Sequence, residues 1–269
     1  MSAPSERATR RWRWRRKRSH GATMTMMEHL SELRRRLIVS MVAFLIVSTV
    51  AFLFYEPLLD FIRRPLCDLP RDLLGPQGCR LVYLKVLGGF LFRVKLTALA
   101  GILFTSPVWL YQIWAFITPG LTSKEKRYAI PFVLTSVILF GVGAFFAYVT
   151  LPTGIRILVG LGGTSLDPLL GADEYINFVG LMFLGFGVTF ELPLVLFFLG
   201  LAGILPVETL RKQRKVAIVS ITALAAIVTP SQDPYTLLVL AVPLYALYEL
   251  TIVVLRLITR RRERAKQSV

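Results

Sequence analysis

The sequence has few charged and few reactive side chains. Only 18% of its 269 residues are charged, and it contains two histidines and two cysteines. The HExxH, GxSxG and GxxxxGK patterns, which are typical of zinc proteases, α/β-hydrolases and phosphate-binding loops, do not occur in it. The sequence therefore gives no support to an enzyme, and we expect no catalytic residues, no metal site and no cofactor.

Hydrophobic residues make up 55% of the chain, and its mean hydropathy is +0.62. This is too apolar for a soluble domain of such length. A pI near 10.4 would suggest nucleic-acid binding if the basic residues formed one face of a soluble fold. They lie instead in short segments between apolar runs, so we expect an all-α polytopic membrane protein and no nucleic-acid partner.

Six apolar runs are candidates for transmembrane helices. They cover residues 37–55, 96–116, 128–152, 175–205, 216–228 and 235–255. A helix needs about 17 to 25 residues to cross a bilayer. The run 216–228 has only thirteen, and by length alone it is more typical of a buried or re-entrant segment.

The distribution of basic residues favours six spans. If all six runs cross the membrane, 24 of the 32 Lys and Arg residues lie on the side that holds both termini. The positive-inside rule then places both termini in the cytoplasm. Without 216–228 as a span, the basic C-terminal tail would move to the other side. We therefore predict six helices in the cytoplasmic (inner) cell membrane, with both ends inside.

Two basic tails flank the predicted membrane domain, which we assign to residues 24–260. Residues 1–23 contain the stretch RRWRWRRKR and are predicted to be a disordered cytoplasmic tail that anionic lipid attracts. Residues 261–269 form a second, shorter basic tail, also predicted to be cytoplasmic.

Cys67 and Cys79 both fall in the predicted first outer segment. That compartment permits disulfides, and closing so short a segment would stabilise the fold by about 2–3 kcal/mol. Two cysteines in one segment also fit a pair of thiols, so the sequence leaves both alternatives open.

The stretch EHLSELRRRL, residues 28–37, places acids before the first apolar run. Its leucines recur at helical spacing, which predicts an amphipathic helix at the membrane surface that runs into the first span. Glu32 precedes Arg36 by four residues, and such a surface pair contributes only about 0.2–0.5 kcal/mol. A simple salt bridge explains Glu32 as well as a binding role does, and Glu28 has no evident role.

Two further acids are notable for their positions. Glu125 follows Pro119 and Gly120 and falls in the first turn of the next predicted helix, where the helix dipole favours an acid. Glu191 lies within the apolar stretch FGVTFELP, and a charged carboxylate at the bilayer centre costs about 2.5–3.5 kcal/mol. We expect Glu191 to be a functional polar site or to form a hydrogen bond between helices.

Four ordered motifs resemble those of the TatC family, whose members are components of the twin-arginine translocase. They are EHLSELRRRL before the first span, FTSPVWLYQIWAFITPGLTSKEKR across the second, FGVTFELP in the fourth and TPSQDP before the sixth. The resemblance runs from about residue 27 to 261. It implies a curved helical bundle with a concave polar face, which receives folded proteins whose signal peptide carries two adjacent arginines.

The resemblance also assigns residues. It implies that Glu32 and Glu125 bind the signal arginines, with Phe116 beside them. We also include Arg34 among the signal-binding residues, as a topology anchor and gatekeeper that holds Glu32 ready. Pro65 in the first outer segment and Asp233 before the sixth span match further family positions.

The partners that the resemblance implies are twin-arginine signal peptides and the single-span subunits TatA and TatB. Several copies would assemble with these subunits, and the proton-motive force would supply the energy for transport. A rival hypothesis is a secondary transporter or ion channel in which Glu191 and Glu249 carry protons or cations.

Overall fold

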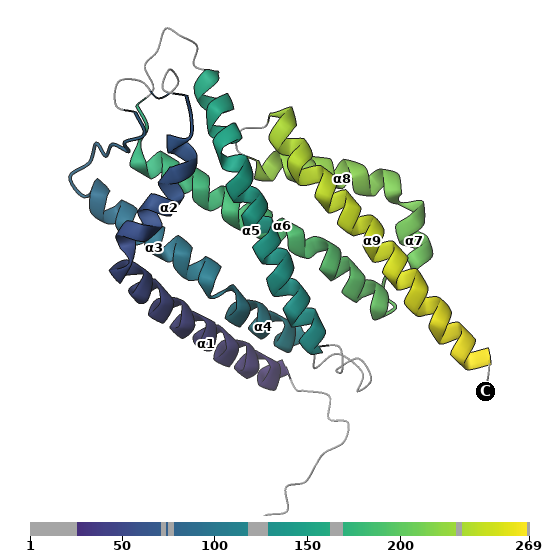
Figure 1. Ribbon diagram of the computed structural model, residues 1–269. Coiled ribbons are helices and arrows are strands. Elements are labelled where there is room, and N and C mark those ends of the chain that lie inside the picture. Colours follow the sequence, from purple (N-terminus) through teal and green to yellow (C-terminus); the bar gives the residue numbers. More distant parts are fainter. Residues whose placement is uncertain are drawn as a thin grey trace, which may run out of the picture.

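The computed structural model describes residues 26–70, 74, 78–117, 129–161, 169–229 and 233–267. This part of the chain folds into helices joined by short connections (Figure 1). The helices are α1 (Met26–Leu53), α2 (Tyr55–Cys67), α3 (Gly88–Phe104), α4 (Ser106–Ile117), α5 (Ala129–Gly160), α6 (Ala172–Leu201), α7 (Val207–Lys212), α8 (Arg214–Val228) and α9 (Pro234–Gln267). The all-helical prediction is confirmed for these residues.

Four of the helices are long and apolar enough to cross a membrane, namely α1, α5, α6 and α9. The pair α3 and α4 forms a fifth candidate, which bends by 53° between its two halves. Each predicted apolar run overlaps one of these helices or α8. With 15 residues, α8 is shorter than the usual length of a spanning helix.

The ends of the helices gather at two sides of the molecule (Figure 1). The start of α1, the end of α4, the start of α5 and the ends of α6 and α9 lie together at the lower side of the view. The short helix α2, the end of α5 and the starts of α6 and α9 lie at the upper side. The chain therefore returns to its starting side by the end of α9.

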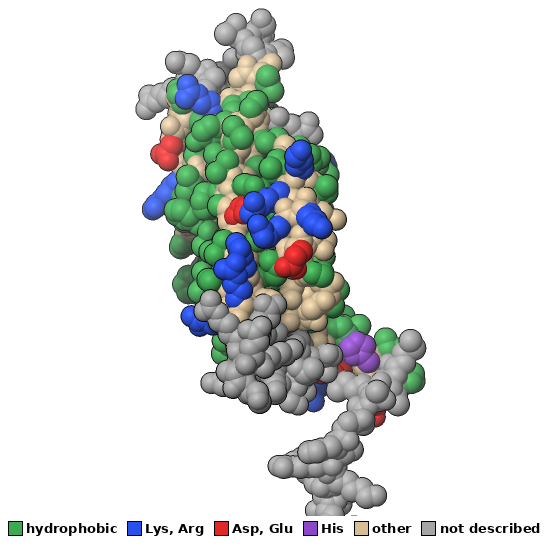
Figure 2. Space-filling view, turned by 90° about the vertical axis from the view of Figure 1, so that its right-hand side faces the viewer, with side chains coloured by type: hydrophobic (Ala, Val, Ile, Leu, Met, Phe, Trp, Pro, Cys, Tyr) green, Lys and Arg blue, Asp and Glu red, His purple; other side chains and the backbone are tan. Residues whose placement is uncertain are grey.

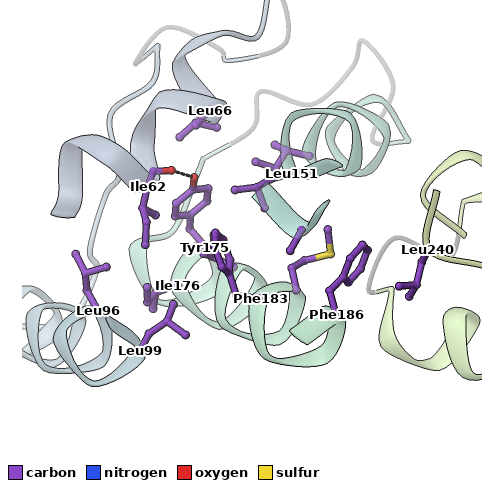
Figure 3. Close-up of a cluster of buried hydrophobic side chains, with 14 of the residues drawn as sticks. Ile62, Leu66, Leu96, Leu99, Leu151, Tyr175, Ile176, Phe183, Phe186 and Leu240 are labelled. Atoms are coloured by element: carbon purple, nitrogen blue, oxygen red, sulfur yellow. Dashed lines mark hydrogen bonds between the residues drawn. The ribbon is translucent and has the colours of Figure 1, made fainter. Parts of the chain in front are cut away.

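The close crossing of α5 and α6 forms the centre of the fold. A Cβ atom on Gly143 of α5 would lie 2.7 Å from the Phe186 carbonyl oxygen and 2.9 Å from the Gly187 Cα. Only glycine permits this approach of the two backbones, which is the usual role of small residues between membrane helices. Large apolar side chains pack in the same core, including the fully buried Met182 and Phe186 (Figure 3).

The start of α6 holds the outer segment against this core. The Tyr175 hydroxyl donates a hydrogen bond to the Ile62 carbonyl of α2 at 2.5 Å (Figure 3). The segment before α3 pairs with the same region, because Val82 donates to Leu170 at 3.0 Å and accepts from Ala172 at 2.8 Å. These bonds join parts of the chain that are about 90 or more residues apart.

Pro65 and the two cysteines lie within or beside α2. Pro65 is buried inside this helix, so this part of the predicted outer segment is helical. Cys67, the last residue of α2, forms a disulfide with Cys79, with their Cα atoms 4.9 Å apart. The disulfide ties the end of α2 to the residues just before Val82.

The helix α1 packs more loosely than the others. Among its described side chains only Ala51 is buried, and Leu30, Leu33 and Leu37 are exposed. Residues 28–37 run into the first span as predicted, because both belong to one continuous helix. Its leucine stripe faces away from the bundle.

Arg93 of α3 fixes the joint between α1 and α2. Its guanidinium donates to the Phe52 carbonyl at 3.1 Å and lies 4.2 Å from the Phe52 ring and 4.7 Å from the Tyr55 ring. A cation near the C-terminus of a helix satisfies carbonyls that have no partner within the helix. The contact explains why a basic residue lies near the start of an apolar helix.

We predict that the disulfide stabilises the outer segment. Replacing Cys67 and Cys79 by serine should lower the free energy of unfolding by about 2–3 kcal/mol, because the unfolded chain regains the freedom of the closed loop. Denaturant unfolding in detergent measures this, and reductant should destabilise the wild type but not the double variant. Equal alkylation of the wild type with and without reductant would contradict the bond.

Candidate functional site

Five side chains meet where the first turns of α1 pass the last turns of α4. His29, Glu32 and Arg36 follow each other at three and four residues on one face of α1, and Gln112 and Phe116 lie one turn apart on α4. The His29 ring stacks on the Phe116 ring, with centroids 4.3 Å apart. Arg36 Nη1 donates to Gln112 Oε1 at 3.3 Å. We call this group the α1–α4 site.

Glu32 is the acid of the α1–α4 site. Arg36 donates to its Oε1 atom from Nε at 3.2 Å and also from Nη2. The other oxygen, Oε2, is buried and has no hydrogen-bond partner among the described residues. Such an atom is uncommon in a folded protein. The salt bridge expected as the simpler explanation is present, and it leaves one carboxylate oxygen for a second donor.

The remaining predicted residues of this region lie elsewhere. Arg34 is exposed and, two positions from Glu32, points to another side of α1, so the structure does not bring it to the α1–α4 site. Glu28 lies in the first turn of α1, where an acid complements the helix dipole. Glu125 falls between α4 and α5, outside the described residues.

Glu191 lies one turn after the α5–α6 crossing. The fully buried Ser136 of α5 donates to its Oε2 atom at 2.7 Å, which is the predicted hydrogen bond between helices. Its Oε1 atom is buried and lacks a partner within the described part of the chain. Nearby, the Thr251 hydroxyl of α9 approaches the Pro193 carbonyl at 3.3 Å. The carboxylate is thus both a link between helices and an unsatisfied polar group.

Asp233 begins α9. Its Oδ1 atom accepts a hydrogen bond from the Thr236 backbone N–H at 2.8 Å, and its Oδ2 atom accepts from the Thr236 hydroxyl. An Asp in this position satisfies an N–H group that the first turn of a helix leaves without a partner. The contacts give Asp233 a structural role at the start of α9.

Glu249 holds α8 and α9 together. Arg214 of α8 lies 2.6 Å from its Oε2 atom, and the Tyr245 hydroxyl donates to its Oε1 atom at 3.0 Å. Figure 2 shows basic and acidic side chains gathered on an otherwise largely apolar face of the molecule. Glu249 thus bonds to α8, whereas Glu191 of α6 bonds to α5.

The sequence did not indicate three side chains of these sites. The spacing could have indicated His29, because it precedes Glu32 by three residues and so lies on the same face of the helix. Gln112 and Ser136 are polar residues within apolar runs, and other polar residues occur in the same runs. Only the packing of the helices shows that each faces an acid or its partner.

Long apolar helices, with carboxylates held at the contacts between them, define a helical multi-pass membrane protein. The sequence model of the family described as Sec-independent protein translocase protein (TatC) matches residues 28–243. The chain belongs to the TatC family, and the resemblance that its four motifs carry is confirmed.

The sequences of related proteins match this chain along most of its length. The Sec-independent protein translocase protein TatC of Frankia casuarinae is 42% identical over 86% of this chain, which spans 65% of that protein. The protein of the same name from Aquifex aeolicus is 39% identical over 91% of this chain and all of its own length. A crystal structure of the twin arginine translocase receptor TatC in DDM superposes with a TM-score of 0.69 at 40% identity, over 84% of this chain and 99% of that one.

We predict that the hydrogen bond between Ser136 and Glu191 stabilises the α5–α6 contact. Ser136→Ala should lower the free energy of unfolding by about 1 kcal/mol or more, because it leaves both carboxylate oxygens of Glu191 unsatisfied. Ser220→Ala removes an exposed hydroxyl from α8 and serves as the matched control. Equal unfolding curves for the two variants in detergent would show that the bond contributes nothing.

Proposed function

We propose that this chain is the signal-binding subunit of a twin-arginine translocase and supports the transport of folded proteins across the cytoplasmic membrane. The observation that carries the proposal is the unsatisfied Oε2 atom of Glu32, held beside an aromatic pair at one end of the bundle. Membership of the TatC family supports it, as does the receptor name of the similar crystal structure.

The chemistry of the α1–α4 site suits an arginine of the signal peptide. A guanidinium is a planar fork that donates several charge-assisted hydrogen bonds, each worth about 1.5–3 kcal/mol. Arg36 already occupies Oε1 of Glu32, so the signal arginine takes Oε2. The stacked rings of His29 and Phe116 offer an aromatic surface nearby, on which a guanidinium also binds favourably.

Two arginines require a second acid, and we assign it to Glu125. Glu125 follows the last residue of α4 by eight positions, and that end of α4 carries Phe116 and Gln112. One carboxylate for each guanidinium gives recognition of the pair, whereas a single acid would accept any lone cation.

Arg36 is a positioning residue in this proposal. Its guanidinium joins Glu32 of its own helix to Gln112 of α4, so it holds the carboxylate at the boundary between the two helices. The adjacent exposed Arg34 and Arg35 add positive charge that discourages other cations. Their charge also favours a cytoplasmic position for this end of α1.

The topology that we propose has six spans with both termini in the cytoplasm. It is supported by the excess of Lys and Arg on one side of the six apolar runs and by the return of α9 to the side where α1 begins (Figure 1). The short α8 crosses by local thinning of the bilayer. The membrane domain then covers residues 24–260, and the basic tails 1–23 and 261–269 lie at the inner leaflet.

The partners proposed are TatA and TatB, with several copies of each chain and anionic lipid around them. A single bundle of this size encloses no folded protein, so transport requires assembly. The transporter or channel hypothesis has less support. Its two acids, Glu191 and Glu249, each bond to a different helix, and the relatives are named as protein translocase components.

Replacing the two proposed acids tests the binding site. Glu32→Gln and Glu125→Gln should each weaken binding of a twin-arginine signal peptide about tenfold or more, because each loses charge-assisted hydrogen bonds. Glu208→Gln, an exposed acid in the first turn of α7, is the matched control and should bind normally. Photo-crosslinking in membranes measures the occupancy. If the signal peptide crosslinks normally to the variant that carries both Glu32→Gln and Glu125→Gln, neither residue belongs to the binding site.

The proposed six-span topology depends on whether α8 crosses the membrane. Reporter fusions placed after residue 206 and after residue 231, on either side of α8, should report opposite sides of the membrane. A fluorescent protein that folds in the cytoplasm and an alkaline phosphatase that is active outside provide the two readouts. The same side for both fusions would make α8 a re-entrant or buried helix.

A further inference from the structure

A groove of about 400 Å³ lies between α5, α6 and α9, separate from the α1–α4 site. Its lining includes Pro131, Thr135, Phe197, Leu250, Val254 and Ile258. Pro131 and Thr135 on one rim and Leu250 on the other are exposed, so the groove opens on the outside of the bundle, toward lipid.

The lining presents hydrocarbon to any occupant. Two hydroxyls lie in the groove, and both are already bonded to backbone carbonyls. Thr135 donates to the Pro131 carbonyl at 2.8 Å, and Thr251 donates to the Leu247 carbonyl at 2.9 Å. A polar ligand entering here would lose its hydrogen bonds to water without replacement. The occupant is therefore apolar.

Apolar side chains of three helices, α5, α6 and α9, line the groove. An acyl chain is narrow and flexible enough to follow the whole groove.

One end of the groove is basic. Leu247, Val254 and Arg261 follow each other at intervals of seven residues and so lie on one face of α9. The first two line the groove, and the exposed Arg261 stands directly beyond its end. Arg256 is two residues from Val254 and lies on the opposite face of α9. An apolar channel that ends at a cation fits an amphiphile with an anionic head.

We propose that this groove binds an anionic phospholipid of the surrounding membrane, with an acyl chain between α5, α6 and α9 and its phosphate at Arg261. Basic residues at the cytoplasmic ends of membrane helices form such headgroup sites. The bound lipid fills the space that α5, α6 and α9 leave between them. The site does not depend on signal binding at Glu32.

Native mass spectrometry of the full chain in detergent tests the proposal, with phosphatidylglycerol and phosphatidylcholine as probes. We expect the wild type to retain phosphatidylglycerol in preference. Arg261→Gln should reduce its affinity roughly fivefold, as expected for one basic contact. Arg256→Gln, on the same helix but the opposite face, should leave the affinity unchanged. Equal losses in the two variants would overturn the proposal in favour of diffuse attraction.

The acyl chain is tested by filling the groove from its rim. Leu250→Trp should weaken binding of both phospholipids, because the indole occupies the path of the chain. Thr135→Trp on the opposite rim repeats the test, and thermal unfolding of each variant shows that it is folded. Unchanged lipid binding by both folded variants would overturn the proposal. The proposal would also be overturned if these variants lost a single-span partner protein while their lipid binding stayed unaltered. The groove would then be a contact for a protein.

Discussion

The close crossing of α5 and α6 is the constraint on which the rest of the structure depends. Helices in a membrane gain little from burying apolar surface, so close backbone packing must hold them together. Gly143 allows this approach, and Gly187 receives the Phe140 ring so closely that a Cβ atom there would lie 2.6 Å from it. Glu191 follows Gly187 by one turn, which brings its carboxylate to Ser136 of α5. The polar bond is thus a consequence of the glycine contact.

The α1–α4 site has a different physical character. It lies on α1, where only Ala51 is buried among the described side chains, and on the second half of the bent α3–α4 pair. The contacts that align it include the link from Arg36 to Gln112 and the stack of His29 on Phe116. A rigid centre and a lightly held α1 suit the proposed function, in which the chain binds a peptide and then passes it on. The unsatisfied oxygen of Glu32 is the polar group that a signal arginine would complete.

Much of the fold was predictable because hydropathy and charge act over whole segments. The apolar runs all correspond to helices, and the family motifs were recognisable in order. The bend near Thr105, the helix around Pro65 and the capping role of Asp233 were not predictable, because each depends on local backbone geometry. The same holds within the site. The pairing of Glu32 with Arg36 followed from their spacing of four residues, whereas Gln112 and Ser136 became visible only through contacts between helices.

The central claim is that Glu32 recognises a signal arginine through charge-assisted hydrogen bonds to its Oε2 atom, and a double-mutant cycle tests it most directly. Peptide affinity is measured for the wild type and Glu32→Gln, each with a twin-arginine peptide and with peptides in which either arginine is replaced by lysine. The account predicts that one of the two replacements weakens binding to the wild type by about tenfold but has little effect on Glu32→Gln. Independent, additive losses for both replacements would contradict direct contact between Glu32 and the signal arginines.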